Sequence, residues 1–149
     1  MLFRSERYPE SPVVVFSAAE NDDNVMRAVD AGARGFIPKS LACEELVGAI
    51  KSLLEGGIYL PRELVSVPAP ATRSYGMPEI TARDIGLTER QAQVLALLVQ
   101  GKPNKVICRE LNLAEGTVKI HVTAILSALK VQNRTQAVIA ASKIGLRLP

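Results

Sequence analysis

The sequence predicts a small α/β module followed by an all-helical domain, with a proline-rich linker between them. Residues 1–60 alternate short apolar runs with helical patterns, and this alternation is typical of a parallel α/β layer. Residues 61–83 contain four prolines, which give a linker partial stiffness. Residues 84–149 show helical patterns alone. The chain is therefore expected to consist of two small folded parts joined by this linker.

The first part is expected to hold two buried strands and two helices. The apolar runs at 12–18 and 35–38 predict strands buried on both faces. A helix is expected from about Asp22 to Gly32, with Val25, Met26 and Val29 as its apolar stripe. A second helix is expected at about 41–55, ended by Gly56 and Gly57, and its inward-facing residues are predicted to be Leu46, Ile50, Leu53 and Leu54.

Four helices are expected in the last part. The first begins after Thr88, which forms a capping box with Gln91, and ends at Gly101. The others are expected at about 104–111, with Pro103 at its start, at 115–129 and at 135–144.

The helix expected at 115–129 has two different faces. Its apolar residues recur at helical spacing and predict one buried stripe, made of Val118, Val122, Ile125 and Leu129. The opposite stripe is Gly116, Lys119, Ile120, Thr123 and Ser127. Small and hydrogen-bonding residues of this kind suit a helix that enters a DNA groove. Periodicity alone leaves an ordinary solvent-exposed helix equally open.

Charge is distributed unevenly along the chain. Residues 1–86 hold 9 Lys/Arg against 12 Asp/Glu, a net charge of −3, and residues 87–149 hold 9 against 3, a net charge of +6. A basic domain favours a polyanionic partner, although a solvated basic face would look the same. There is neither an apolar run long enough for a bilayer nor a secretion signal at the start. Cys43 and Cys108 lack metal-site spacing, so we expect two reduced, mostly buried thiols in a cytoplasmic protein.

Four consecutive segments of the helical part carry a family resemblance. They run from Leu87 to Leu95, from Gly101 to Ile107, from Gly116 to Val122 and from Leu129 to Ala137. Together they resemble the LuxR/NarL type of helix-turn-helix domain. The resemblance implies a four-helix domain that binds double-stranded DNA as a homodimer, with its third helix in the major groove. It implies a transcription regulator. Since the sequence contains no Ser/His/Asp, Cys/His or Gly-rich phosphate motif, we expect no enzyme, and we predict no catalytic residue, metal site or cofactor.

The resemblance also assigns residues. Lys119, Ile120 and Thr123 would face base edges. A second group would contact the DNA backbone or fix the domain's own geometry: Asn104, Lys105, Thr117, His121, Lys130, Asn133 and Arg134. The chain departs from the family in having Gln91 where Glu is usual, Pro103 and Ala114 where Ser is common, and Thr123 where some members have Lys.

Residues 1–60 resemble the back half of a response-regulator receiver, a doubly wound flavodoxin-like fold, with residues 1–7 as the end of a preceding helix. Ser17, Phe36 and Lys39 match the switch hydroxyl, the switch aromatic residue and the lysine that contacts the phosphoryl group. The strands that would carry the acidic Mg²⁺ pocket are missing from this N-terminally truncated receiver. The aspartates of this half, Asp22, Asp23, Asp30 and Asp84, do not follow an apolar strand. We therefore expect no phosphorylation.

The sequence thus predicts a sequence-specific, DNA-binding regulator of the two-component type that is not phosphorylated. An alternative is an interaction protein that dimerises with full-length response regulators and modulates them. The half-receiver could pair with another copy, be partly disordered or belong to a longer gene product, and the sequence leaves these three open. It also leaves open the operator, the affinity, the input signal and the choice between activation and repression.

Overall fold

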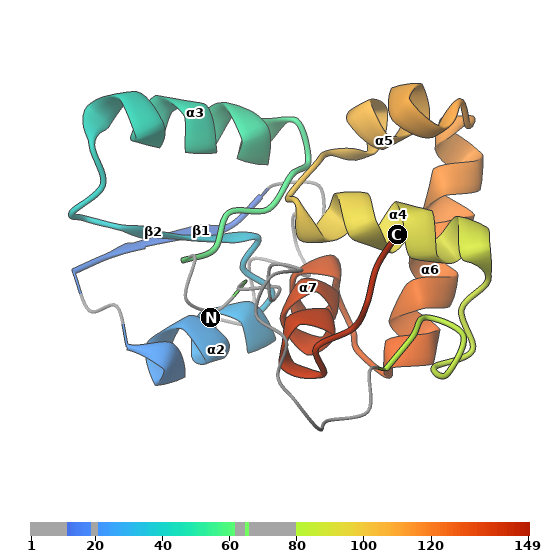
Figure 1. The fold of residues 1–149 in the computed structure, drawn as a ribbon. Coiled ribbons are helices and arrows are strands. Elements are labelled where there is room, and N and C mark those ends of the chain that lie inside the picture. The colour runs from blue at the N-terminus through green and yellow to red at the C-terminus, as the bar shows by residue number, and fades with distance from the viewer. Residues whose placement is uncertain (1–11, 19–20, 62–64, 66–79) are drawn as a thin grey trace.

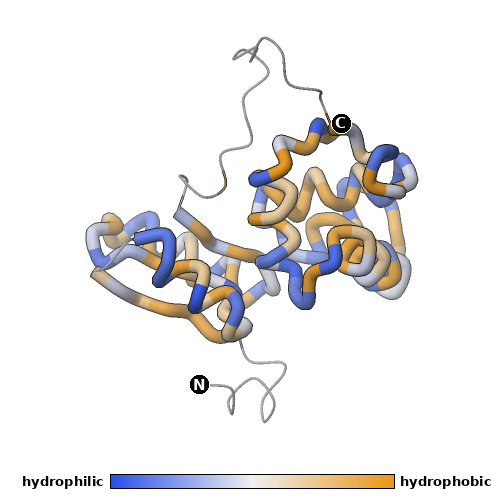
Figure 2. The backbone as a smooth tube through the Cα atoms, turned by 90° about the horizontal axis from the view of Figure 1, so that it is seen from below, coloured by the Kyte–Doolittle hydropathy of each residue, from blue (hydrophilic) through white to orange (hydrophobic). Residues whose placement is uncertain are grey.

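The structure, a computed structural model, describes residues 12–18, 21–61, 65 and 80–149. The predicted linker at 61–83 falls largely outside these residues, and so does the helix end predicted at 1–7. The described residues form two lobes that lie side by side (Figure 2), an N-terminal α/β lobe and a C-terminal helical lobe. Within them, no helix is both long and apolar enough to span a membrane.

The N-terminal lobe is built around a parallel two-stranded sheet. β1 (Val14–Ser17) pairs with β2 (Gly35–Pro38). The helix α2 (Asp22–Asp30) connects the strands on one face, and α3 (Cys43–Leu54) covers the other (Figure 1). Tyr59 forms a parallel bridge with Gly35 on the free side of β2. The predicted parallel α/β module is therefore confirmed, but the prediction that the first strand is buried on both faces is wrong, because Phe16 of β1 is 52% exposed.

The boundaries of α2 follow from its sequence. Asp22 and Asp23 occupy its first turn, where negative charge stabilises the helix by interacting with the positive end of its dipole. Val25 and Val29 are buried one turn apart. Gly32 follows the last turn with a φ of 92°, a conformation that glycine adopts without strain.

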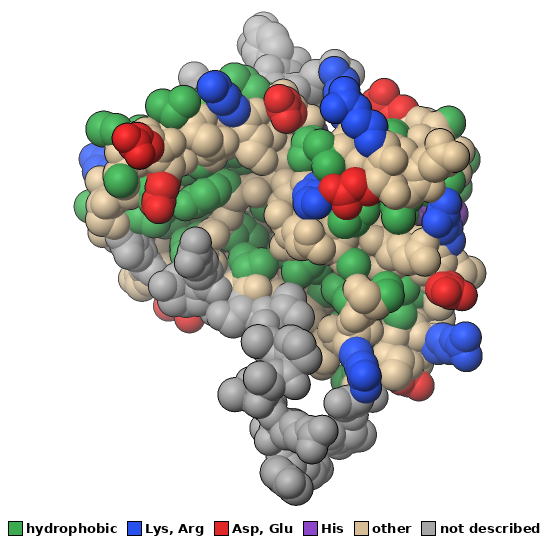
Figure 3. Space-filling view, turned by 45° about the horizontal axis from the view of Figure 1, so that its top comes forward, with side chains coloured by type: hydrophobic (Ala, Val, Ile, Leu, Met, Phe, Trp, Pro, Cys, Tyr) green, Lys and Arg blue, Asp and Glu red, His purple; other side chains and the backbone are tan. Residues whose placement is uncertain are grey.

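The predicted inward face of α3 is partly wrong. Leu53 is buried as expected, but Ile50 is 43% exposed and Leu54 is 72% exposed. In the described part of the chain, the sheet beneath α3 has only two strands. It is wide enough to bury one stripe of the helix, which runs through Ala49 and Leu53. Ile50 and Leu54 each lie one residue, about 100° of helix rotation, past that stripe. Hydrophobic side chains are consequently visible over α3 in Figure 3.

The start of α3 differs from the prediction as well. The helix begins at Cys43 rather than near Leu41, and Cys43 is exposed. The expectation of a mostly buried thiol is therefore wrong for Cys43, because the first residue of this helix projects beyond the sheet. Cys108 is intermediate in exposure, and both cysteines are free.

The C-terminal lobe contains the four predicted helices. They are α4 (Glu89–Val99), α5 (Asn104–Leu111), α6 (Glu115–Leu129) and α7 (Arg134–Lys143). Thr88 and Gln91 form the expected capping box at the start of α4. The helix α7 begins one residue earlier than predicted, because the Asn133 side chain caps it by accepting from the Gln136 N–H at 2.8 Å.

One hydrophobic core extends across both lobes. It joins Val29 and Phe36 to Leu95 and Leu98 of α4 and to other buried residues of the helical lobe. The backbones of the two lobes also approach closely beside this core, where the Ile58 N–H donates to the Gly101 carbonyl at 3.3 Å. The two lobes therefore share buried surface in addition to surface polar contacts.

This close approach predicts a difference between two glycines. Gly101 and Gly145 both have positive φ, 76° and 61°, so alanine is strained at either position. A Cβ at Gly101 would also lie 2.8 Å from the Ile58 carbonyl oxygen, whereas one at Gly145 would meet nothing within 4 Å. We expect Gly145→Ala to lower the free energy of unfolding by about 1 kcal/mol, and Gly101→Ala to lower it clearly further. Urea denaturation measures both, and equal losses would contradict the lobe contact.

Candidate nucleic-acid interface

The orientation of α6 is fixed by its buried side. Val118 and Ile125 are completely buried, and Val122 and Leu129 are half-buried. This side packs against α4, α5 and α7. In Figure 1, α6 lies on the side of the molecule away from the N-terminal lobe. Its other side is therefore open to solvent.

The three predicted base-facing residues lie together on this open side. Lys119, Ile120 and Thr123 are all exposed, within an exposed stripe that also includes Gly116 and Ser127. The Lys119 ammonium lies 3.4 Å from a Glu115 carboxylate oxygen, one turn earlier on the helix. The Thr123 hydroxyl donates to the Lys119 carbonyl at 3.0 Å. The arrangement of these residues is that of a surface able to enter a groove.

The second predicted group divides by exposure. Lys105 and Lys130 are exposed at the start of α5 and just after α6, and Thr117 and His121 are half-buried on α6. Lys130 has a φ of 53° and ends α6 in the left-handed conformation. These four side chains remain candidates for contacts with a DNA backbone.

Arg134 is directed into the protein instead. Its Nη1 donates to the Gly56 carbonyl at 2.5 Å and to the Asn104 side-chain oxygen at 3.4 Å, and its Nη2 donates to the Lys102 carbonyl at 3.0 Å. Its Nε is buried with no hydrogen-bond partner within the described structure. Of the two alternatives for Arg134 and Asn104, this geometry favours fixing the domain over contacting phosphate.

The charge of Arg134 has no carboxylate within ion-pair distance in the described part of the chain. Burial and, as a smaller cause, the like charge of Arg34 together lower the pKa of Arg134 to about 10. The guanidinium therefore stays protonated at neutral pH. Its main compensation comes from carbonyl oxygens, and Gly56 lies just past the C-terminal, negative end of the α3 dipole.

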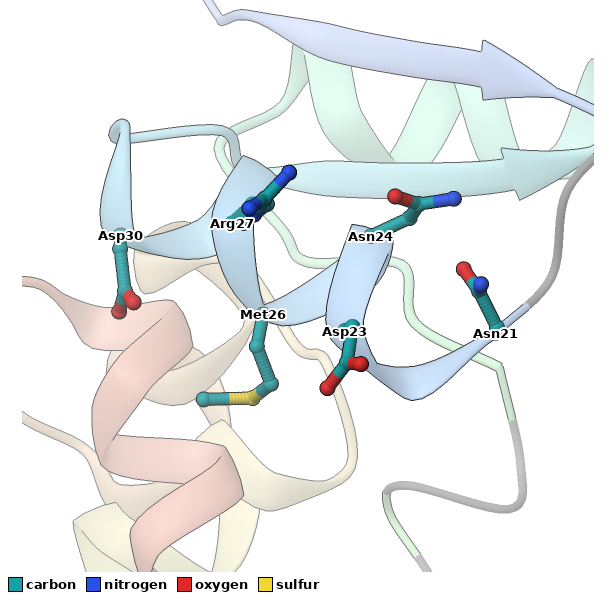
Figure 4. A pocket seen from close by; sticks show the side chains of 6 residues that line it. All are labelled: Asn21, Asp23, Asn24, Met26, Arg27 and Asp30. Atoms are coloured by element: carbon teal, nitrogen blue, oxygen red, sulfur yellow. The ribbon is translucent and has the colours of Figure 1, made fainter.

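Neighbouring residues at the start of α7 make similar contacts to α2. The Asn133 amide donates to the Val29 carbonyl at 3.2 Å, and the Gln136 amide donates to an Asp30 carboxylate oxygen at 3.1 Å. Figure 4 shows Met26 and Asp30 pointing from α2 toward α7. Sequence reasoning missed Gln136, although Asn133 followed by Gln three residues later is the spacing of a helix start.

The three receiver-like residues fall into two environments. Ser17 ends β1, and its carbonyl accepts from the Lys39 N–H at 2.9 Å, so these two residues meet at the carboxyl ends of the strands. The Lys39 ammonium lies 6.0 Å from the centre of the Phe16 ring. Phe36 is 1% exposed and belongs to the shared core.

None of the four aspartates named above belongs to a strand or directly follows one. Asp22, Asp23 and Asp30 lie on α2. Asp84 accepts from the Thr81 hydroxyl at 2.6 Å and the Thr81 N–H at 2.7 Å, and these bonds lower the pKa of its carboxyl. Among the described residues no three His, Cys, Asp or Glu side chains gather closely enough to hold a metal ion.

The bonds of Arg134 predict that lysine cannot replace it. Two nitrogens of the rigid guanidinium fork bond the Gly56 and Lys102 carbonyls, and Arg134→Lys replaces this fork with a single nitrogen that does not match its geometry. We expect a loss of about 2 kcal/mol in the free energy of unfolding in urea. Arg109→Lys, at an exposed position on α5, is the matched control. We expect this control to change the free energy of unfolding by less than about 0.5 kcal/mol. Equal losses in the two variants would contradict a structural role for Arg134.

Comparison with known proteins shows which family the helical lobe resembles. Residues 86–141 match the bacterial regulatory proteins of the luxR family. The glycerol metabolism activator of Pseudomonas putida is 37% identical over 142 residues, which cover 91% of this chain and 63% of that protein. The nitrate/nitrite response regulator protein NarL of Escherichia coli strain K12 is 35% identical over 128 residues, covering 85% of this chain and 58% of that protein.

Among solved structures, the response regulator ChrA of a heme-sensing two-component system is 27% identical, with a TM-score of 0.38. The match covers 93% of this chain and 65% of ChrA. The chain spans less than two thirds of the length of these three relatives. Residues 86–141 form a luxR-family domain, and the chain is similar over most of its length to LuxR/NarL-type response regulators.

Proposed function

We propose that this chain binds double-stranded DNA in a sequence-specific manner and regulates transcription in the cytoplasm. The observation that carries the proposal is the exposed stripe of α6, held outward by the burial of Val118 and Ile125. Its support is the net charge of +6 on residues 87–149 and the membership of a family of regulatory proteins. Two copies would bind a two-fold-related site, each with α6 in the major groove.

Within this proposal the residues have distinct roles. Lys119, Ile120 and Thr123 read base edges, because they share the open side of α6. Lys105 and Lys130 contact phosphates, and Thr117 and His121 line the edges of the same surface. Arg134, Asn133 and Asn104 position α5 and α7 through the bonds described above. Phosphate contacts give affinity and register, whereas base contacts give sequence preference.

Residues 84–149 would be the DNA-binding domain and residues 1–60 a regulatory module. The module packs against α7 and the turn between α4 and α5, on a different side of the helical lobe from α6 (Figure 1). In this arrangement the module leaves the DNA-reading stripe uncovered. The shared core explains how the state of the module could influence the helical lobe.

DNA binding is tested with a duplex selected by the chain from a random-sequence library, titrated between 50 and 200 mM salt. We expect affinity to fall steeply as salt rises, because bound lysines displace counterions. Lys119→Ala should lose the preference for the selected sequence, whereas Lys130→Ala should weaken binding to all sequences alike. Lys51→Ala, on the distant helix α3, is the control and should change neither quantity. Binding that Lys119→Ala leaves selective would contradict the assignment.

We further propose that these 149 residues do not accept a phosphoryl group. An aspartyl phosphate requires a carboxylate at the end of a strand beside a metal ion and a lysine, whereas Asp22, Asp23 and Asp30 lie on α2. Treatment of the purified chain with acetyl phosphate and Mg²⁺ should leave its mass and its DNA affinity unchanged. A hydroxylamine-sensitive increase in mass would disprove the proposal.

One observation favours a second function. Val47, Ile50 and Leu54 form an exposed apolar stripe on α3, which would suit pairing with a full-length response regulator. This function would replace the first if the chain showed no DNA binding above the non-specific level and co-purified with such a regulator.

A further inference from the structure

The open side of α6 has an apolar centre. Ile120 is 70% exposed, and the other exposed large hydrophobic residue described in 80–149, Ile144, is only 37% exposed. Single exposed hydrophobic residues are common on protein surfaces. Ile120 differs because it lies in the middle of a stripe whose other members are small or polar, with Gly116 one turn before it and Thr123 and Ser127 after it.

Thr123 adds a methyl group to this centre. Its hydroxyl donates its one proton to the Lys119 carbonyl at 3.0 Å, within the helix. The hydroxyl proton is therefore used within α6, and the apolar group that this exposed side chain can offer to a ligand is its methyl group. A base edge that met Thr123 would find an apolar group and no free proton.

The polar and apolar parts of the stripe are separated. The Lys119 ammonium is drawn toward the start of α6 by Glu115, at 3.4 Å. Gly116 has no neighbour within 4 Å of the position a Cβ would take, so nothing of the protein fills the space one turn before Ile120. A duplex could approach Ile120 closely on that side, while Lys119 reached a different base pair.

We propose that Ile120 and the Thr123 methyl group read the 5-methyl groups of thymine in each half-site. Thymine is the base that presents a methyl group in the major groove, and apolar side chains recognise it there. Lys119 would read the O6 and N7 acceptors of a neighbouring guanine. This inference rests on the proposed DNA-binding function and adds the chemistry of the operator: each half-site holds thymine opposite Ile120 and Thr123.

The test replaces thymines of the selected duplex with deoxyuridine, one at a time. This change removes a single methyl group and leaves base pairing intact. We expect one or two positions in each half-site at which the replacement lowers affinity about fourfold, as one buried methyl group predicts. Thymines in the flanking sequence serve as controls and should tolerate the change. In Ile120→Ala, replacement at a thymine that contacts Ile120 should have no further effect.

Two substitutions of Thr123 separate its methyl group from its hydroxyl. Thr123→Ser keeps the hydroxyl and removes the methyl group, and we expect about fourfold weaker binding for each half-site. Thr123→Val keeps a methyl group and removes the hydroxyl, and it should bind at least as tightly as the unsubstituted chain. Thr123 is exposed, so neither substitution should change the free energy of unfolding in urea by much.

The outcomes distinguish this inference from the function beneath it. Selective binding that no deoxyuridine replacement weakens would overturn methyl reading and leave DNA binding intact. Tight binding by Thr123→Ser together with weak binding by Thr123→Val would also overturn it, because the hydroxyl would then be the reader. A chain that selects no duplex from the library would overturn both.

Discussion

The burial of one side of α6 determines what the other side presents. Val118 and Ile125 are seven residues apart, and neither is exposed to solvent. Together they fix the rotation of α6 about its axis, so the stripe from Gly116 to Ser127 must face outward. The start of α6 has no side-chain cap at Ala114, so packing against α4 and its neighbours, rather than capping, holds the helix in place. The proposed base readout depends on this packing.

A second constraint is the set of hydrogen bonds that joins the two lobes. Arg134 donates to oxygen atoms from two separate segments, to Gly56 after α3 and to Lys102 and Asn104 at the start of α5. Asn133 and Gln136 reach the last turn of α2 from the same end of α7. The last carbonyl groups of a helix have no partner within the helix. At the C-terminal ends of α2 and α3, side chains from the start of α7 donate to such carbonyl groups. This junction lies away from α6, so the contact between the lobes and the proposed DNA contact use different surfaces of the helical lobe (Figure 1).

Much of the secondary structure could be predicted from sequence because its signals are local. The capping box at Thr88, the glycines that end helices and the bounds of α6 all follow from short patterns. The exposure of Ile50 and Leu54 could not be predicted, because α3 carries apolar residues on more than one side. Only the extent of the sheet decides which of these sides is covered. The inward role of Arg134 depends on carbonyls up to 78 residues away along the chain. Sequence spacing carries no signal for such contacts.

The most direct test of this account is the change in backbone amide NMR shifts when the chain is titrated with its selected duplex. The account predicts large shifts at Gly116, Lys119, Ile120 and Thr123, and small shifts on α2 and α3. It predicts the same pattern in 50 and in 150 mM salt, weaker in the latter. Shifts concentrated on α2 or α3, with those of the α6 stripe unchanged, would show that DNA binds elsewhere and would contradict the central role of α6.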